Sequence, residues 1–443
     1  MCEVFVVKKT KARAKPAKPE TARPSGISAI SVEGYKSLHK KTEVEIRPLT
    51  ILAGANSSGK SSLLQPLLLM KQTLEAPYDP GALLLNGPHV RFTSFDQLLS
   101  KNETGLLVDR FSTGFTVSDG RRLRITFDRL VEGGFDVAET VHDNIQKHTS
   151  ITLKRGMSQG KLPGLSKKES AHAELKRMRC FLDILHHSGG EFALDEIRQA
   201  REIHPIAMIH VPALRRSPER AYGITAVGNT FPGPFEPYVA SIIHRWQGTQ
   251  DERLNTLNSF LQTLGLTTRV QAQRLNDTQI ELSVGRLKKG NTKKSATDMI
   301  SIADVGFGIS QIMPLLVALL TAREGQLVYI EQPEIHLHPN AQVALATVLA
   351  HAANRGVRVV AETHSALLLL GIQTLVAEQK LSPTDVALHW FERMEDGMSR
   401  VTSAELDESG AFGDWPEDFD DVTLKAQAKY MDAAENRLVL GKS

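Results

Sequence analysis

The sequence predicts an α/β fold with a parallel central sheet, and three observations lead to this prediction. A short apolar run at residues 49–54 is followed by a glycine-rich loop and then by an apolar segment of helical spacing. Apolar runs of strand length alternate with helical segments over residues 300–376. Between these regions, alternating apolar and polar residues predict antiparallel strands. Because strands that alternate with helices are typical of parallel sheets, the two outer regions are expected to form the core.

Residues 1–26 are expected to form a disordered basic tail. The segment is rich in Lys, Ala and Pro, has no apolar period, and holds seven Lys and Arg against two Glu. It cannot bury enough apolar surface to offset its chain entropy. A basic arm can touch nucleic acid, and a purely solubilising tail explains it equally well. The chain has a net charge of +3 and the tail carries +5, so the remainder carries −2 and gives no strong electrostatic case for DNA binding.

Residues 27–100 are expected to form the N-terminal half of the core. Two alternating segments, ISAISVEGY and TEVEIRP, predict half-buried strands, and LTILAG predicts a short buried strand. The segment SSLLQPLLLMKQTLE then predicts a helix. Its Pro66 lies in the first turns, where a missing amide donor is tolerated.

Residues 101–295 are expected to form a large α+β insertion. A hairpin is predicted at residues 104–130, because an SDGR turn separates two alternating runs. Residues 165–203 are charged and predict helix, whereas MIHVPAL predicts a buried strand. Helices are expected over residues 235–265, followed by a hairpin in RVQAQRLNDTQIELSV and a basic surface loop, KKGNTKK.

Residues 296–380 are expected to form the C-terminal half of the core, and residues 381–443 a C-terminal element. The former alternate helix, strand, helix and strand: GISQIMPLLVALLTA, LVYIE, NAQVALATVLAHAANR and VRVVAET. The two cysteines, Cys2 and Cys180, cannot form a disulfide framework, which favours a reducing cytoplasm. Since no apolar run approaches the roughly 18 residues that span a bilayer, no membrane association is expected.

The loop at residues 54–61 reads GANSSGKS, which fits G-x-x-x-x-G-K-[ST] between a predicted strand and a predicted helix. Gly54 and Gly59 let the backbone wrap phosphate, Lys60 neutralises the charge of the β- and γ-phosphates, and Ser61 can ligate Mg²⁺. If this segment were only a structural Gly/Ser-rich loop, the presence of Lys60 would have no explanation. The motif therefore predicts a nucleotide site with ATP and Mg²⁺ as cofactors, lined also by Asn56, Ser58 and Ser62.

Further motifs follow in a fixed order: DVGFGISQ at 304–311, EQPEIHLHP at 331–339, ETHS at 362–365 and GDWPEDFDD at 413–421. With them, and with Asn56 in the P-loop, the sequence resembles ABC-type P-loop ATPases of the SMC-like and OLD (overcoming-lysogenisation-defect) group. More narrowly, it is similar to bacterial ATPases with a C-terminal G-x-WP-x-x-F-D-D element. The resemblance spans about residues 27–430. It implies an ABC-type ATPase head with a mixed or parallel sheet, interrupted by the α+β insertion.

The resemblance also implies roles for matching residues. Gly306, Gly308 and Ser310 match the signature element, which contacts the γ-phosphate on the opposite subunit, although the serine falls late. The alternative interpretation is that these glycines only form the start of a helix, without a role in phosphate binding. Glu331 matches the acid that holds the metal together with Ser61. His364 matches the switch histidine that senses the γ-phosphate.

Gln332 stands where the resemblance places a catalytic carboxylate. A glutamine can hold a water molecule but cannot accept its proton, and glutamine serves as a water-positioner in small GTPases. Glu334, two residues on, is the other candidate base. Both residues are therefore catalytic candidates, and a slow ATPase is expected.

Other features are weaker. His336 and His338 lack the third and fourth ligands of a zinc site. The acidic run DFDD (418–421) is expected to be structural or partner-binding rather than part of a nuclease, with Trp415 and Phe419 as packing anchors. Phosphate contacts and surface salt bridges explain three arginines about equally well: Arg215, Arg216 and Arg220. Gln97 is a weak candidate for a nucleotide-sensing residue.

These inferences predict a cytoplasmic ATPase that forms a homodimer, or a higher homo-oligomer, around ATP. The resemblance extends to ATPase subunits of Septu-type and PARIS-type anti-phage systems, which implies a separate effector such as a nuclease or toxin. An SMC-like DNA-repair ATPase is the main alternative, but it calls for coiled-coil arms or a basic groove. A transporter subunit is disfavoured by the absence of LSGGQ, and a stand-alone nuclease by the absence of a catalytic module.

Overall fold

The computed structural model describes residues 26–101, 104–163, 165, 169, 172–186, 207–286, 298–413, 429 and 431. Several expectations lie outside these residues: the basic tail up to residue 25, the KKGNTKK loop, and the part of the C-terminal element that holds Trp415, Phe419 and the DFDD run. No helix among the described residues is long and apolar enough to cross a membrane.

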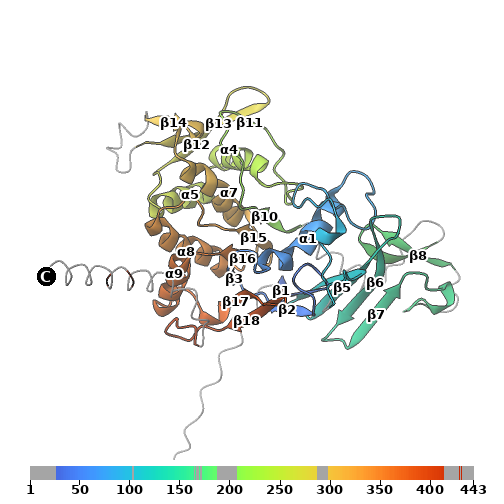
Figure 1. Ribbon diagram of the computed structural model, residues 1–443. Helices are drawn as coiled ribbons and strands as arrows, with labels where there is room; N and C mark the ends of the chain where they lie inside the picture. The colour runs from blue at the N-terminus through green and yellow to red at the C-terminus, as the bar shows by residue number, and fades with distance from the viewer. Residues whose placement is uncertain are drawn as a thin grey trace, which may run out of the picture.

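A six-stranded mixed sheet forms the centre of the molecule (Figure 1). Five neighbouring strands are parallel, and the last pairs antiparallel at the edge. In spatial order the strands are β10 (Ile209–Val211), β15 (Leu327–Glu331), β16 (Arg358–Thr363), β3 (Leu49–Gly54), β17 (Val386–Arg393) and β18 (Ser399–Ala404). The predicted α/β class with a mixed sheet is confirmed.

The two faces of this sheet bury different layers, because successive side chains of a strand point to opposite faces. Ile51 and Val359 pack with one group of helices, whereas Leu52 and Val360 pack with α1 and a second sheet. Figure 1 shows the first group of helices gathered on one side of the central sheet and the second sheet on the other. The first group consists of α4 (Val239–Thr249), α5 (Glu252–Thr263), α7 (Phe307–Thr321), α8 (Pro339–Asn354) and α9 (Ala366–Ala377). Helix α1 (Lys60–Glu75) lies on the face of the second sheet.

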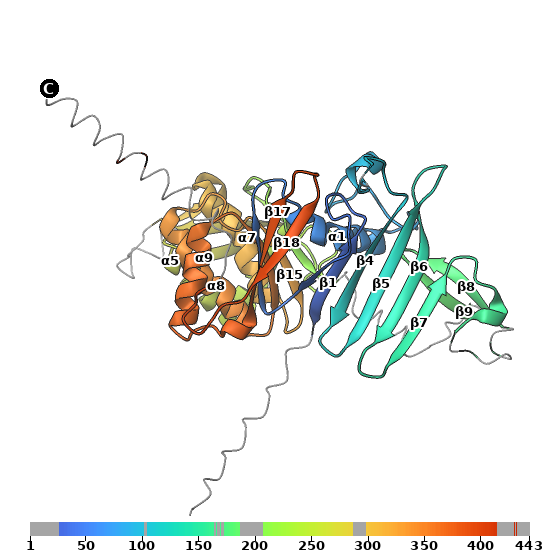
Figure 2. The ribbon, with the colours of Figure 1, turned by 60° about the horizontal axis from the view of Figure 1, so that its bottom comes forward.

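The second sheet is antiparallel and extends away from the centre (Figure 2). Its order is β2 (Thr42–Glu45), β1 (Ile27–Glu33), β4 (Arg110–Val117), β5 (Arg121–Arg129), β6 (Phe135–Asn144) and β7 (Thr149–Lys154). Two smaller sheets are built from β8 (Ala173–Met178), β9 (Phe181–His186), β11 (Tyr222–Gly223), β12 (Val270–Arg274), β13 (Gln279–Gly285) and β14 (Met299–Ser301).

The segment 101–295 is joined to both large sheets. Its strand β4 pairs with β1, and its strand β10 pairs with β15 at the edge of the central sheet. The predicted hairpins at 104–130 and 269–284 and the predicted helices at 235–265 are confirmed.

The helix predicted over residues 165–203 is wrong at residues 173–186. Residues 173–186 form the hairpin β8–β9, in which Met178 pairs with Phe181 across a two-residue turn. Arg179 in the turn has a φ of 55°, and its guanidinium donates to the carbonyls of Thr73 and Leu74 at the end of α1, each at 2.7 Å. The turn lacks the Asn-Gly or Asp-Gly signal of a two-residue hairpin, so packing against α1 decides the structure over the local pattern.

Candidate nucleotide site

The P-loop connects β3 to α1 at the carboxyl edge of the central sheet. Gly54 (φ 139°) ends the strand, and Gly59 (φ 104°) precedes the first helical residue. A Cβ at Gly54 would lie 2.1 Å from the Phe391 carbonyl oxygen, and one at Gly59 would lie 2.4 Å from Ser399 Oγ. Both positions therefore require glycine, and the α1 N-terminus is left facing outward as an anion-binding end.

Lys60 folds back over this loop. Its Nζ donates to the carbonyl oxygens of Gly54 (3.0 Å) and Ala55 (2.8 Å). Burial lowers the pKa of Lys60, and the charges of Glu362 and Glu334 oppose the shift. The ammonium is thus held in the loop by two carbonyls, which phosphate oxygens can replace.

The other P-loop residues differ in exposure. Asn56 is exposed, whereas Ser62 is buried in the first turn of α1. The Ser58 hydroxyl is buried and makes no hydrogen bond within the described part of the chain. A free buried hydroxyl beside the loop fits an incoming oxygen ligand.

Ser61 contacts an acid that the motifs did not single out. Its Oγ donates to Glu362 Oε2 at 2.8 Å, and the Tyr329 hydroxyl donates to the other oxygen of the same carboxyl group. Glu362 is the last residue but one of β16, the strand between β15 and β3, and only 4% of it is exposed. Burial raises the pKa of Glu362 to about 7, and the neighbouring charge of Glu331 adds to the shift. The only available sequence signal was an acid at a strand end in ETHS, beside the switch histidine.

Glu331 is fixed from the opposite side of β15. His210 Nε2 lies 3.1 Å from its Oε1, and the amide of Ala213 donates to its Oε2 at 3.1 Å. Burial pushes the pKa of Glu331 up, but the hydrogen bonds from His210 and Ala213 outweigh it and leave the pKa below its usual value. The carboxylate is thus held ionised and oriented.

The donor set fits magnesium. This ion prefers oxygen ligands, and the Ser61 hydroxyl and Glu362 carboxyl group already touch, while Glu331 pairs with Glu362 across adjacent strands. The candidates for holding the ion are therefore Glu362 and the two residues proposed from the sequence, Ser61 and Glu331, whose role stays a prediction.

The two candidates for water activation differ in environment. Gln332 has a φ of 43° and its backbone amide donates to the Glu362 carbonyl at 2.8 Å. Glu334 Oε1 accepts from the His364 amide at 2.8 Å, whereas its buried Oε2 makes no hydrogen bond of good geometry with the described residues. Burial raises the pKa of Glu334, and the backbone amides and the nearby Thr363 hydroxyl offset only part of the shift. Glu334 thus has a free carboxyl oxygen.

His364 lies beside the P-loop, as the switch interpretation predicts. Burial lowers the pKa of its half-buried imidazole, the charge of Lys60 adds to this shift, and a backbone contact at Gly54 opposes it. A neutral ring at this position can offer a hydrogen bond to a phosphate oxygen or to water.

The signature segment begins α7. Gly306 is the N-cap residue and is exposed, and a Cβ at Gly308 would lie 3.1 Å from the His336 carbonyl oxygen. Ser310 is buried, and its hydroxyl donates to the Phe307 carbonyl at 3.0 Å. The exposed residues of this segment are Asp304, Gly306 and Phe307, and a phosphate contact by Ser310 stays a prediction.

Arg215 is not a surface residue. Its guanidinium donates to the carbonyls of Pro212, Gln311 and Glu331, and burial lowers its pKa to about 10. It fastens the segment after β10 to α7 and β15.

Two other predicted arginines and one glutamine lie on the surface. Arg220 forms an exposed ion pair with Asp304, and Arg216 is exposed. Gln97 bonds to Thr93 in a local turn. These contacts explain Arg220 and Gln97 without a nucleotide.

The two histidines after β15 are exposed. His338 caps α8 by accepting from the Asn340 amide, and the His336 ring lies 6.0 Å from the Phe307 ring. Among the residues that the structure describes, no group of three His, Cys, Asp or Glu side chains is placed to hold a metal ion.

Glu362 allows a test by pH. Its raised pKa of about 7, against an ordinary value of 4.5, means that the folded protein keeps a proton that the unfolded chain releases. The free energy of unfolding without nucleotide should therefore fall as pH rises from 4.5 through 7, by about 3 kcal/mol in total. Glu362→Gln cannot ionise and should remove this part of the fall. Melting temperatures of both proteins at pH 5 and pH 8 check it, with the exposed Glu395→Gln as control. An identical pH dependence in wild type and Glu362→Gln would contradict the assignment.

A strand, a glycine-built loop with a buried lysine, and a helix N-terminus beside strand-end acids define a P-loop NTPase. The chain belongs to the family described as "AAA domain, putative AbiEii toxin, Type IV TA system", whose profile matches residues 49–370.

Several solved structures are similar to the chain. One is an SMC head bound to the C-terminal winged-helix domain of ScpA: 12% identity, TM-score 0.48, covering 87% of this chain and 99% of that one. Another is the SMC head domain from Thermotoga maritima: 9% identity, TM-score 0.42, covering 86% and 100%. A third is the SMC head with coiled coil and joint from Pyrococcus yayanosii: 9% identity, TM-score 0.44, covering 87% and 98%. A search of curated proteins finds no match to the chain.

Proposed function

We propose that this protein binds ATP·Mg²⁺ at the P-loop, hydrolyses it slowly, and dimerises around the nucleotide to regulate a separate effector protein. The observation that carries the proposal is the contact of Ser61 with Glu362 beside the buried Lys60, at the edge where the parallel strands end. A cation and a set of oxygen ligands at a helix N-terminus are the parts that bind a nucleoside triphosphate with its magnesium ion.

Each residue has a distinct task in this proposal. Lys60 and the amides of the P-loop bind the phosphates, and Ser61, Glu362 and Glu331 hold Mg²⁺. When bound, this ion neutralises phosphate charge and polarises the transferred phosphoryl group. Glu334 takes the proton of the attacking water, and His364 orients the water or the γ-phosphate.

A slow rate follows from two features. Gln332 cannot accept a proton, and one oxygen of Glu334 is already held by the His364 amide. Proton transfer is then left to a single carboxyl oxygen on a bent segment, where both Gln332 and His336 have positive φ. Slow hydrolysis is what a molecular switch requires if its dimer is to persist while ATP is bound.

Dimerisation is supported by the exposed start of α7. Phe307 is 56% exposed and Leu214 is 92% exposed, although both are large apolar residues. The N-terminus of α7 also offers its positive dipole end to solvent, and its N-cap residue is the exposed Gly306. A second copy of the chain would bury these residues and present this helix end to the γ-phosphate.

Sizing the protein with and without ATP tests the proposed function. Glu334→Gln with ATP and Mg²⁺ should elute at twice the mass of the nucleotide-free protein, because turnover no longer empties the site. Phe307→Asp should keep ATP binding and stay monomeric, because a charge at the interface is costly to bury. Light scattering during gel filtration measures both. A Glu334→Gln protein of unchanged mass at saturating ATP would refute nucleotide-dependent dimerisation.

The effector assignment rests on the family and on the sequence resemblance. The family description names a toxin and a toxin–antitoxin system, and the resemblance extends to ATPase subunits of anti-phage systems. We therefore propose a nuclease or toxin as the separate effector, in a role in anti-phage defence.

A further inference from the structure

A chain of buried polar side chains leads from Glu331 to the far end of α1. His210, on β10, is 4% exposed and its Nε2 lies 3.1 Å from Glu331 Oε1. Its ring stacks on Tyr329, with centroids 5.2 Å apart and an interplanar angle of 11°. Since β10 and β15 run parallel with His210 opposite Tyr329, the sheet itself sets the position of the ring.

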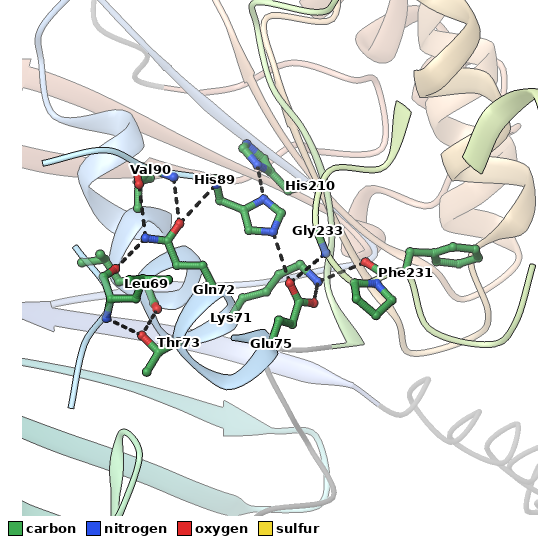
Figure 3. A network of polar contacts seen from close by, with 12 residues as sticks. Leu69, Lys71, Gln72, Thr73, Glu75, His89, Val90, His210, Phe231 and Gly233 are labelled. Carbon is green, nitrogen blue, oxygen red and sulfur yellow. Dashed lines mark hydrogen bonds and ion pairs between the residues drawn. The ribbon is translucent and has the colours of Figure 1, made fainter. Parts of the chain in front are cut away.

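A second histidine, His89, contacts His210 (Figure 3). His89 Nδ1 is 3.3 Å from His210 Nδ1, and His89 Nε2 is 3.6 Å from Glu75 Oε2. Glu75 in turn contacts Lys71 and accepts from the Gly233 amide at 3.0 Å. The backbone amide of His89 donates to Gln72 Oε1 at 3.2 Å, so α1 holds the second ring in place.

These contacts give the hydrogen bonds a direction. An ionised carboxylate only accepts, so His210 Nε2 must carry the hydrogen that it shares with Glu331. In the neutral tautomer His210 Nδ1 is then an acceptor. The Glu331 carboxylate thus fixes which nitrogen of His210 carries the hydrogen.

We propose that His210 is a positioning residue for Glu331. The inference rests on the proposed function, in which Glu331 helps to hold Mg²⁺. A carboxylate that carries one hydrogen bond from an imidazole and one from the Ala213 amide has both oxygens oriented, so it can meet the ion without rotating. Removal of the His210 donor leaves the carboxylate without the hydrogen bond at Oε1 that the imidazole supplies.

His389 shows what an ordinary buried histidine of this sheet looks like. It is 2% exposed, and its two nitrogens contact Ser403 Oγ and the Glu45 carbonyl oxygen, both at 2.8 Å. Both partners are neutral groups, one on the adjacent strand β18 and the other on β2 of the second sheet. His210 differs because its partner is a carboxylate at the site edge, so His389→Gln is a matched control for the loss of a buried imidazole.

The test compares the affinity for a fluorescent ATP analogue with Mg²⁺ and with EDTA, in His210→Leu, His210→Gln and His389→Gln. Glutamine can donate from near the Nε2 position, whereas leucine cannot. The gain is the ratio of the affinity with Mg²⁺ to the affinity with EDTA. In His210→Leu this ratio should be smaller than in wild type by about 10-fold or more, the usual effect of losing a hydrogen bond to a metal ligand. His210→Gln should recover most of the gain. His389→Gln should lower the melting temperature and leave the gain unchanged.

Three outcomes are decisive. A full Mg²⁺ gain in a folded His210→Leu protein overturns the positioning role. A His210→Gln protein that is folded but as impaired as His210→Leu also overturns it, because the donor is then irrelevant. If wild type itself gains no affinity from Mg²⁺, the proposed function fails and the inference fails with it. Melting curves of all variants establish folding, so that this third result is distinct from the first two.

Discussion

Lys60→Ala is expected to abolish measurable ATP binding. The ammonium supplies charge-assisted hydrogen bonds to the phosphates, each worth roughly 1.5–3 kcal/mol, so loss of two such bonds lowers affinity by about 100-fold or more. In the nucleotide-free protein, the hydrogen-bond partners of the same Nζ among the described residues are the carbonyls of Gly54 and Ala55. Isothermal titration with a non-hydrolysable ATP analogue and Mg²⁺ measures the effect.

The fold should survive this substitution. Lys60 forms no ion pair of hydrogen-bonding distance with a described residue, and its burial already lowers the pKa of the ammonium, so the nucleotide-free protein has little to lose. Lys380→Ala, on the surface beside Glu378, is the matched control and should bind ATP as wild type does. ATP binding by a folded Lys60→Ala protein would refute the site assignment.

The parts of the site that the sequence predicts are those that lie in one continuous segment. The P-loop at residues 54–61 contains its strand, its glycines and its lysine within one local pattern, so its structure follows from the residues themselves. Glu331 and His364 are similar cases, since each ends a buried apolar run. Their place at one edge follows because parallel strands bring their carboxyl ends together.

The parts that were missed depend on strand order. Glu362 touches Ser61 only because β16 lies between β15 and β3, and nothing local to ETHS fixes that order. His89 and His210 are 121 residues apart in the chain, and so are His210 and Glu331. The turn at Arg179 is decided by contacts with α1 rather than by its own residues. Long-range packing, which no local pattern encodes, accounts for each case.

The second large effect, on the rate of ATP hydrolysis, is expected at Glu334. It decides whether Glu334 or Gln332 activates the attacking water. Glu334→Gln should lower kcat by about 100-fold or more, the usual loss when a general base is removed, while ATP affinity stays near the wild-type value. Gln332→Ala should lower kcat much less, because an amide only helps to hold the water. Steady-state phosphate release, with binding measured separately, gives both values.

The pH dependence provides an independent check on the same residue. Burial raises the pKa of Glu334 above its usual value, and its base form is lost as pH falls through that raised pKa. Wild-type kcat should therefore fall on the acid side at a pH above that of an ordinary glutamate, and Gln332→Ala should keep this profile. Glu334 has the free buried oxygen that a base needs, whereas the Gln332 backbone is held by Glu362 and Arg215. If Gln332→Ala instead removes turnover and Glu334→Gln does not, the water lies at Gln332, and hydrolysis proceeds by positioning without a protein base.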